Sequence, residues 1–138
     1  MPKFIFIVIL LFCLKREVLS QNLVPDSSFE IKESCPYAIS ELKKLKYWWS
    51  PTVATPDFFC NCEKGKWKNS MVEASDNFVG SQEPRSGYCY VGIIVYNSSK
   101  TGYREYIETK LTQPLEKGKS YSVSFYLKKE FKRPIWWR

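Results

Sequence analysis

The chain has 138 residues, of which 21 are lysine or arginine, 14 are aspartate or glutamate and none is histidine. This length suffices for one domain and not for two. Most of the formal net charge of +7 belongs to the ends, with +2 over residues 1–20 and +4 over residues 128–138, so residues 21–127 carry only +1. The main body therefore has no basic surface for a phosphate backbone, which argues against nucleic-acid binding.

The first twenty residues have the pattern of a secretory signal peptide. Lys3 precedes an unbroken apolar run from Phe4 to Leu14, and Val18–Leu19–Ser20 fits a signal-peptidase site, so we expect cleavage before Gln21. The run is about half as long as the ~20 residues of a membrane-spanning helix, and no later segment is long enough to span. The alternative is a membrane anchor, because the charged residues 15–17 directly after the apolar run are unusual in a signal peptide.

Five segments after residue 20 have the composition of β-strands. They are Asn22–Val24, Ser28–Ile31, Tyr88–Tyr96, Tyr103–Leu111 and Lys119–Leu127. The third is apolar on both faces, as is typical of a central strand. The last two alternate, which predicts that one face of each lies against the core. The residues expected on these core faces are Ile107, Thr109 and Leu111, and then Tyr121, Val123, Phe125 and Leu127.

The remaining segments are predicted as one helix, one long loop and one turn. Ile39, Leu42 and Leu45 recur at every third residue, which predicts a short helix that begins near Ser40. Residues 50–85 lack periodicity and are predicted as a loop, which needs fastening because long structureless loops are uncommon in compact domains. Residues 114–118 form a turn with proline early and glycine late. Many short strands and little helix predict an all-β antiparallel sandwich.

The cysteines indicate an oxidising destination. Cleavage removes Cys13 and leaves Cys35, Cys60, Cys62 and Cys89, an even number in a short exported chain, which favours two disulfides. Four cysteines allow three connectivities. A zinc site is the alternative, but the chain has no histidine and its close pair is Cys-x-Cys, not Cys-x-x-Cys.

Several short motifs, in this order and spacing, resemble a family of exported modules. They are Asn22–Glu30 (NLVPDSSFE), Ser34–Pro36 (SCP), Trp48–Pro51 (WWSP), Thr55–Phe59 (TPDFF), Gly80–Gly87 (GSQEPRSG), Tyr103–Ile107 (YREYI) and Leu115–Leu127 (LEKGKSYSVSFYL). Together they resemble the galactose-binding-like or carbohydrate-binding-like jelly-roll modules of Bacteroidota, which often precede an outer-membrane-protein-A-like domain. The resemblance implies a β-sandwich over residues 21–127.

The resemblance ends at Leu127. The family continues with a strand that carries an acidic residue in an A-x-D-N-I-G-like stretch, whereas residues 128–138 read KKEFKRPIWWR and show no alternation. We expect a frameshift or premature stop here, with a genuine basic-aromatic tail as the alternative. A sandwich without its last strand has an unpaired edge, so we expect marginal stability and a tendency to associate.

The resemblance also implies pairings and a metal site. We expect the disulfide Cys35–Cys62, with Cys60–Cys89 as an additional pair. In similar modules the opening segment and the late acidic residue share a structural calcium ion, which takes six to eight oxygen ligands. Asp26, Ser28 and Glu30 supply candidate ligands, although the late acid is missing. The alternative is turn chemistry by Asp26 and a strand-end role for Glu30.

Five residues are candidates for contact with a saccharide, because aromatic rings pack on the C–H face of a sugar while a few polar groups bind its hydroxyls. They are Trp48, Trp49, Tyr103, Arg104 and Tyr106. Adjacent residues in an extended chain point to opposite faces, so at most one tryptophan is expected to be exposed on a given side. Core packing is the alternative for the tryptophans. For Arg104 with Glu105, structural pairing is the favoured interpretation.

These observations predict a non-catalytic module of the bacterial envelope, with a glycan as the expected partner and the periplasm, outer-membrane surface or exterior as its location. Without histidine the chain lacks the usual base at neutral pH. Asp57, Glu83, Glu105 and Glu108 carry no motif that singles out a catalytic pair. The alternative is a structural or adhesive spacer that binds no sugar, including a truncated, non-functional fragment that has lost its partner domain.

Overall fold

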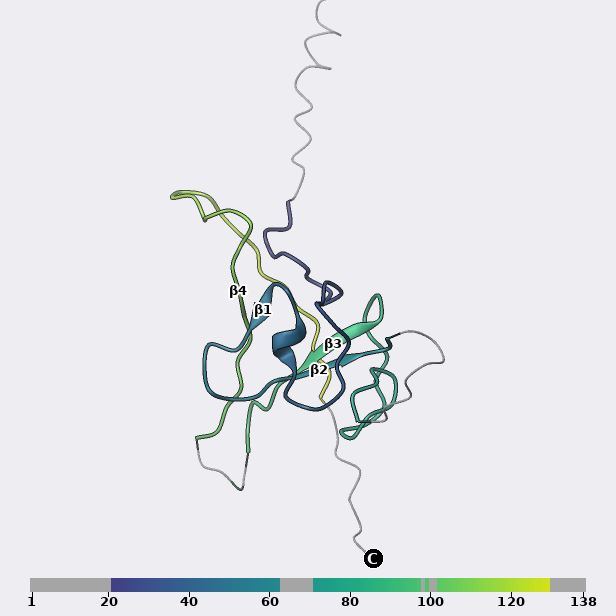
Figure 1. Cartoon of the computed structure of the whole chain (residues 1–138). Helices are drawn as coiled ribbons and strands as arrows, with labels where there is room; N and C mark the ends of the chain where they lie inside the picture. Colours follow the sequence, from purple (N-terminus) through teal and green to yellow (C-terminus); the bar gives the residue numbers. More distant parts are fainter. Residues whose placement is uncertain (1–20, 63–70, 98, 100–101, 130–138) are drawn as a thin grey trace, which may run out of the picture.

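The computed structural model describes residues 21–62, 71–97, 99 and 102–129. The predicted signal peptide and residues 130–138 of the predicted tail lie outside this part. The described chain is mostly extended, with a single turn of 3-10 helix and four short strands (Figure 1). These are η1 (Leu42–Lys44), β1 (Trp48–Trp49), β2 (Asp57–Cys60), β3 (Cys89–Gly92) and β4 (Glu108–Thr109). The predicted all-β character is confirmed at this level.

The strands form two antiparallel sheets of two strands each. β1 pairs with β4, so that Trp48 lies opposite Thr109 and Trp49 opposite Glu108. β2 pairs with β3, from Asp57 opposite Gly92 to Cys60 opposite Cys89. The 3-10 helix contacts both β1 and β2, and thereby joins the two sheets. One sheet therefore pairs the first strand with the last and the other pairs two consecutive strands, and η1 contacts a strand of each sheet.

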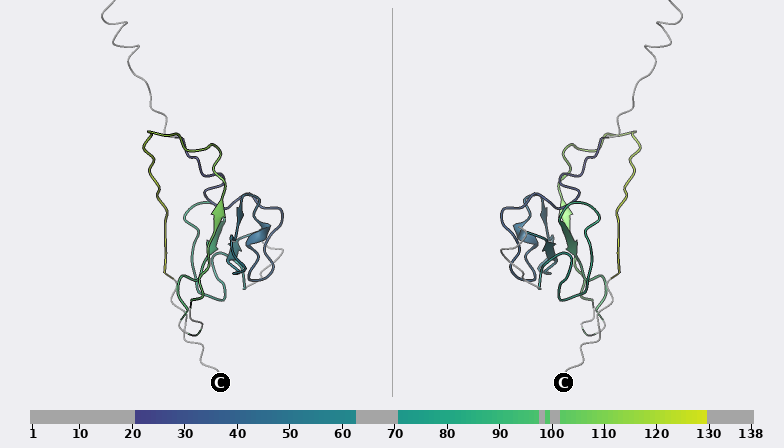
Figure 2. Two further views of the ribbon diagram at one scale, coloured as in Figure 1. Left: turned by 90° about the vertical axis from the view of Figure 1, so that its left-hand side faces the viewer. Right: turned by 90° about the vertical axis from the view of Figure 1, so that its right-hand side faces the viewer.

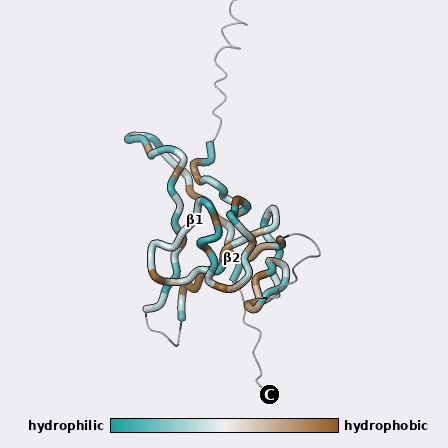
Figure 3. The backbone as a smooth tube through the Cα atoms, viewed as in Figure 1, coloured by the Kyte–Doolittle hydropathy of each residue, from teal (hydrophilic) through white to brown (hydrophobic). Residues whose placement is uncertain are grey.

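The core has two parts, one on each face of β2. Phe58 and Phe59 are adjacent in the strand and point to opposite faces, yet both are buried, with exposed fractions of 0% and 1%. Phe58 packs with Leu42, Leu45 and the Cys60–Cys89 pair, whereas Phe59 packs with other residues. Those residues are Val72 and Ala74, with Val79 and Tyr90 at the margin. The apolar stretches near β2 are visible in Figure 3.

Two disulfides fasten the long segment between β1 and β3. Cys60 is bonded to Cys89, its register partner at the end of the β2–β3 ladder, with the two Cα atoms 4.1 Å apart. Cys35 is bonded to Cys62, with the Cα atoms 6.0 Å apart. This is the pairing expected from the resemblance.

The predicted strand Ser28–Ile31 is wrong, because Asp26 makes this segment a turn. Asp26 and Phe29 have positive φ angles of 46° and 63°. The Phe29 amide donates to the Asp26 carbonyl oxygen (3.1 Å). The Asp26 carboxylate accepts from the amides of Glu30 (2.8 Å) and Ile31 (3.0 Å), so these amides cannot join a ladder.

Other elements differ in extent from the prediction. The Ile39–Leu45 stripe forms only one 3-10 turn, and no strand is assigned at residues 22–24. The strand expected at Tyr88–Tyr96 is shorter, because β3 has a partner only along β2, and residues 93–96 are exposed. The predicted loop of residues 50–85 contains β2. Sequence periodicity could not reveal β2, because Phe58, Phe59 and Cys60 are buried in succession.

Residues 103–111 keep the predicted alternation, although only Glu108–Thr109 is a strand. Ile107, Thr109 and Leu111 are partly buried, while Tyr106, Glu108 and Lys110 are exposed. The expected turn is also present: the Lys119 amide donates to the Glu116 carbonyl oxygen (3.3 Å), and Gly118 has a positive φ of 83°.

The core face predicted for Lys119–Leu127 is wrong. This segment runs as an extended arm apart from both sheets (Figure 2). Its apolar side chains are exposed, from 43% at Tyr121 to 86% at Val123. An alternating pattern buries one face only where a second layer covers it, and none of the described residues does so here. The arm meets the body where Arg85 lies over the ring of Tyr126, 4.3 Å from its centroid.

No helix among the described residues has the length and apolar character needed to cross a membrane.

The two disulfides provide a matched pair of stability tests. Their sequence separations are 29 and 27 residues, so loss of either crosslink has nearly the same chain-entropy cost, about 3–4 kcal/mol. Cys60 and Cys89 are also buried in the core, whereas Cys35 is exposed. We therefore expect Cys60→Ala with Cys89→Ala to be more destabilising than Cys35→Ala with Cys62→Ala, because the former removes two buried side chains and the latter an exposed one and a partly buried one. Urea unfolding of both double variants measures this difference, and an equal or inverted order contradicts the packing.

Candidate functional site

The two adjacent tryptophans of β1 point to opposite sides, as expected for an extended segment. The ring of Trp48 packs against Phe29, with centroids 4.9 Å apart, and its Nε1–H donates to the Asp26 carbonyl oxygen (3.0 Å). Trp49 is 41% exposed. Its Nε1–H has no acceptor among the described residues. Trp48 is therefore a core residue, and Trp49 is the tryptophan that a ligand could reach.

Trp49 borders a hollow of about 260 Å³. One wall comes from η1 and the residue two positions before it, through Ser40, Leu42 and Lys43. The other residues that line the hollow are Trp49, Ser50 and residues 54–56. Three residues that carry hydroxyl groups, Ser40, Ser50 and Thr55, thus line a largely apolar depression together with Trp49.

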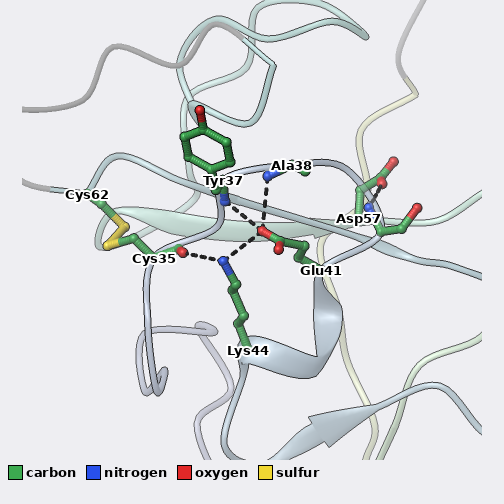
Figure 4. Close-up of polar contacts among 8 residues, drawn as sticks. Cys35, Tyr37, Ala38, Glu41, Lys44, Asp57 and Cys62 are labelled. Carbon is green, nitrogen blue, oxygen red and sulfur yellow. Dashed lines mark hydrogen bonds and ion pairs between the residues drawn. A yellow bond between two sulfur atoms is a disulfide. The ribbon is translucent and has the colours of Figure 1, made fainter.

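The loop that leads into η1 is held by Glu41 (Figure 4). One carboxylate oxygen of Glu41 accepts from the amides of Tyr37 (2.6 Å) and Ala38 (3.0 Å), and forms an ion pair with Lys44 (2.8 Å). The Lys44 ammonium also donates to the Cys35 carbonyl oxygen (2.8 Å), beside the Cys35–Cys62 disulfide. Burial alone would favour the protonated acid, but these hydrogen bonds hold the pKa of Glu41 below its ordinary value of 4.5.

Asp57 fixes the same loop from β2. Its Oδ1 accepts from the Ser40 amide at 2.7 Å (Figure 4). Burial raises the pKa of Asp57 above its ordinary value of 3.8, the Ser40 hydrogen bond opposes this, and the nearby Glu105 carboxylate adds to the rise. The loop beside the hollow is therefore held by two carboxylates, Glu41 with a lowered pKa and Asp57 with a raised pKa.

Glu105 is the most deeply buried acid described, with an exposed fraction of 4%. Its Oε1 accepts from the Tyr103 hydroxyl (2.7 Å) and its Oε2 from the Ile94 amide (2.8 Å). The Tyr103 hydroxyl lies 3.5 Å from Thr55 Oγ1 at the edge of the hollow. The proximity of Glu105 and Asp57 could not be predicted from the sequence, because 48 residues separate them and no motif joins them.

The structure divides the five candidate saccharide residues. Trp49 lines the hollow, Tyr103 reaches its edge through Thr55, and Trp48 belongs to the core. Arg104 lies over the ring of Tyr96, 5.5 Å from its centroid, and donates to the Tyr103 carbonyl oxygen (2.8 Å). Arg104 and Glu105 thus both make structural contacts, though not with each other. Tyr106 is 52% exposed and does not line the hollow.

The residues predicted to bind calcium make hydrogen bonds within the fold. Asp26 accepts from the turn amides described above. Glu30 Oε1 accepts from the amides of Tyr88 (2.8 Å) and Cys89 (2.9 Å) at the start of β3. Gly87 permits this contact, because a Cβ at that position would overlap the Glu30 carboxylate, and its φ is +67°. These contacts match the turn and strand-end alternative. Within the described ranges, no three histidine, cysteine or acidic residues are grouped to hold a metal, and nothing tests the role of Ser28.

No protein-family model, curated protein or solved structure matches the chain. The resemblance to the exported jelly-roll modules therefore stays a prediction.

The two displaced carboxylates predict opposite pH effects. The pKa of Asp57 is raised on folding, so its charged form opposes folding above that pKa, and this cost disappears below pH 3.8. Asp57→Asn keeps an acceptor for the Ser40 amide, so we expect it to be more stable than the parent near neutral pH, with the gain shrinking as the pH falls.

The pKa of Glu41 is lowered on folding, so the charged Glu41 carboxylate stabilises the fold above pH 4.5, and this stabilisation is lost as the pH falls through the lowered pKa. We expect Glu41→Gln to be less stable near neutral pH, with the deficit shrinking in acid.

Urea unfolding of the parent and both variants between pH 3 and pH 7 measures these differences. Each variant is the control for the other, because a general effect of removing an acid would give both the same sign. A loss of stability in both variants at neutral pH would contradict the origin given for the Asp57 shift.

Proposed function

We propose that the chain is a non-catalytic saccharide-binding module that is exported to a bacterial envelope or exterior. The observation that carries the proposal is Trp49, a partly exposed aromatic ring beside a hollow that hydroxyl groups also border. A sugar ring offers an apolar C–H face and a rim of hydroxyls, and this combination of surfaces suits it. The hollow of about 260 Å³ is smaller than the ~300 Å³ at which drug-sized sites begin, so it suits one sugar ring with the rest of the ligand in solvent.

The surrounding framework supports a binding role. Glu41 forms an ion pair with Lys44 of η1, and Asp57 of β2 accepts a hydrogen bond from the Ser40 amide, so both acids hold the loop beside the hollow. The Cys35–Cys62 disulfide fastens the start of the same loop. A wall fixed in this way loses little entropy when a ligand binds. Asp57, which follows the lining residue Pro56, and Glu105 accept hydrogen bonds from backbone amides, which favours structural roles for both over catalysis.

The proposed fold is a galactose-binding-like β-sandwich, of which the two short antiparallel sheets form part. The support is the mostly extended chain, the antiparallel pairing in both sheets, and the motif resemblance. Two disulfides and the signal-like start of the sequence support export to an oxidising compartment.

A glycan array followed by isothermal titration calorimetry tests the proposal on the full-length protein. We expect weak, reproducible binding to at least one oligosaccharide, and a loss of this binding in Trp49→Ala. Aromatic stacking beyond the area buried is worth about 0.5–1.5 kcal/mol, and the lost contact area adds to it, so the loss should be tenfold or more, on the order of 1.4 kcal/mol.

Tyr106→Ala is the matched control, because Tyr106 is also an exposed aromatic but does not line the hollow. It should bind like the parent protein. Loss of binding in Tyr106→Ala with retention in Trp49→Ala would place the site elsewhere. Absence of binding to every glycan would favour a spacer module.

A further inference from the structure

The hollow beside Trp49 has a charged group as well as an aromatic one. Lys43, in the middle of η1, lines the hollow together with Trp49, and it is exposed. No carboxylate pairs with Lys43 among the described residues. Its charge is therefore available to a ligand in the hollow.

The neighbouring lysines are engaged elsewhere. Lys44 pairs with Glu41 and donates to the Cys35 carbonyl oxygen. Lys46 lies over the ring of Tyr47, 5.6 Å from its centroid, and does not line the hollow. Of the basic stretch from 43 to 46, only Lys43 faces the site.

The acids near the hollow do not cancel this charge. Glu41 is paired with Lys44, and the Asp57 carboxylate is directed to the Ser40 amide. Glu108 is the register partner of Trp49, and both residues are exposed, so the two are cross-strand neighbours on β4 and β1. Trp49 therefore shares the hollow with a lysine and has an acid opposite it in the β1–β4 ladder.

We infer that the hollow selects a saccharide with an acidic ring, a uronic acid, whose carboxylate pairs with Lys43 while its C–H face packs on Trp49. This inference rests on the proposed function and names its substrate class. A uronic acid has a carboxylate where the neutral hexose has a hydroxymethyl group, so the charged ring needs no more room than the neutral one. Glu108 sets the orientation, because it repels the carboxylate and accepts from hydroxyls at the other side.

The test compares oligomers of galacturonic acid with galactose oligomers of the same length, by calorimetry with the full-length protein. The two ligands differ only in the charged group. We expect tighter binding of the galacturonic acid oligomer by about two- to fivefold, as for an exposed ion pair. This preference should disappear in 1 M salt, where the screening length is about 3 Å.

Lys43→Gln should bind both ligands with the affinity that the parent has for the neutral one. Lys46→Gln is the matched control and should keep the preference. Glu108→Gln should bind the acidic oligomer more tightly than the parent does.

The outcomes separate the two proposals. If both ligands bind equally, or if Lys43→Gln keeps the preference, the inference is wrong while saccharide binding stands. If Lys46→Gln loses as much as Lys43→Gln, the attraction belongs to the basic stretch as a whole, and the inference is also wrong. If neither ligand binds and the glycan array is empty, the proposed function fails together with the inference.

Discussion

Phe58 and Phe59 occupy adjacent positions of β2, and both are almost completely buried, so β2 must be covered on both faces. Its ladder with β3 and the Cys60–Cys89 disulfide at the ladder's end hold the strand in place. On one face, Phe58 meets η1 through Leu42 and Leu45. On the other, Phe59 meets the segment around Val72. The β2–β3 ladder is therefore common to both parts of the core, because Cys89 of β3 belongs to the first part and Tyr90 packs against the second.

The hollow is a consequence of that arrangement. Residues 54–56 enter β2 and form one wall, while η1 forms the other wall because Leu42 is drawn into the core beside Phe58. Asp57, the first residue of β2, then holds the Ser40 amide, and Glu41 closes the loop. The same buried strand that stabilises the fold thus also fixes the separation of the walls. Adjacent residues of a strand point to opposite sides, so the packing of Trp48 against the core leaves Trp49 on the other side, where it lines the hollow.

The sequence predicts some of these features because they depend on local chemistry. Alternation at residues 103–111, the Gly118 turn and the opposite directions of Trp48 and Trp49 follow from strand and turn geometry. Other features could not be predicted, because distant partners create them. β2 has no alternation because both faces are buried, and Asp57 meets Glu105 only through the fold. In Lys119–Leu127 the clear alternation is misleading, because no described element covers the face that would be buried.

The central claim is that a sugar ring lies against Trp49, and the indole N–H resonances test it most directly. In a titration followed by ¹H–¹⁵N correlation spectra, Trp49 and Trp48 give separate signals that substitution at each position assigns. The account predicts that an oligosaccharide taken from the glycan array shifts the Trp49 signal progressively. The Trp48 signal should stay in place, because its N–H is bonded to the Asp26 carbonyl oxygen. A ligand that binds without moving the Trp49 signal, or that moves only Trp48, would contradict the account.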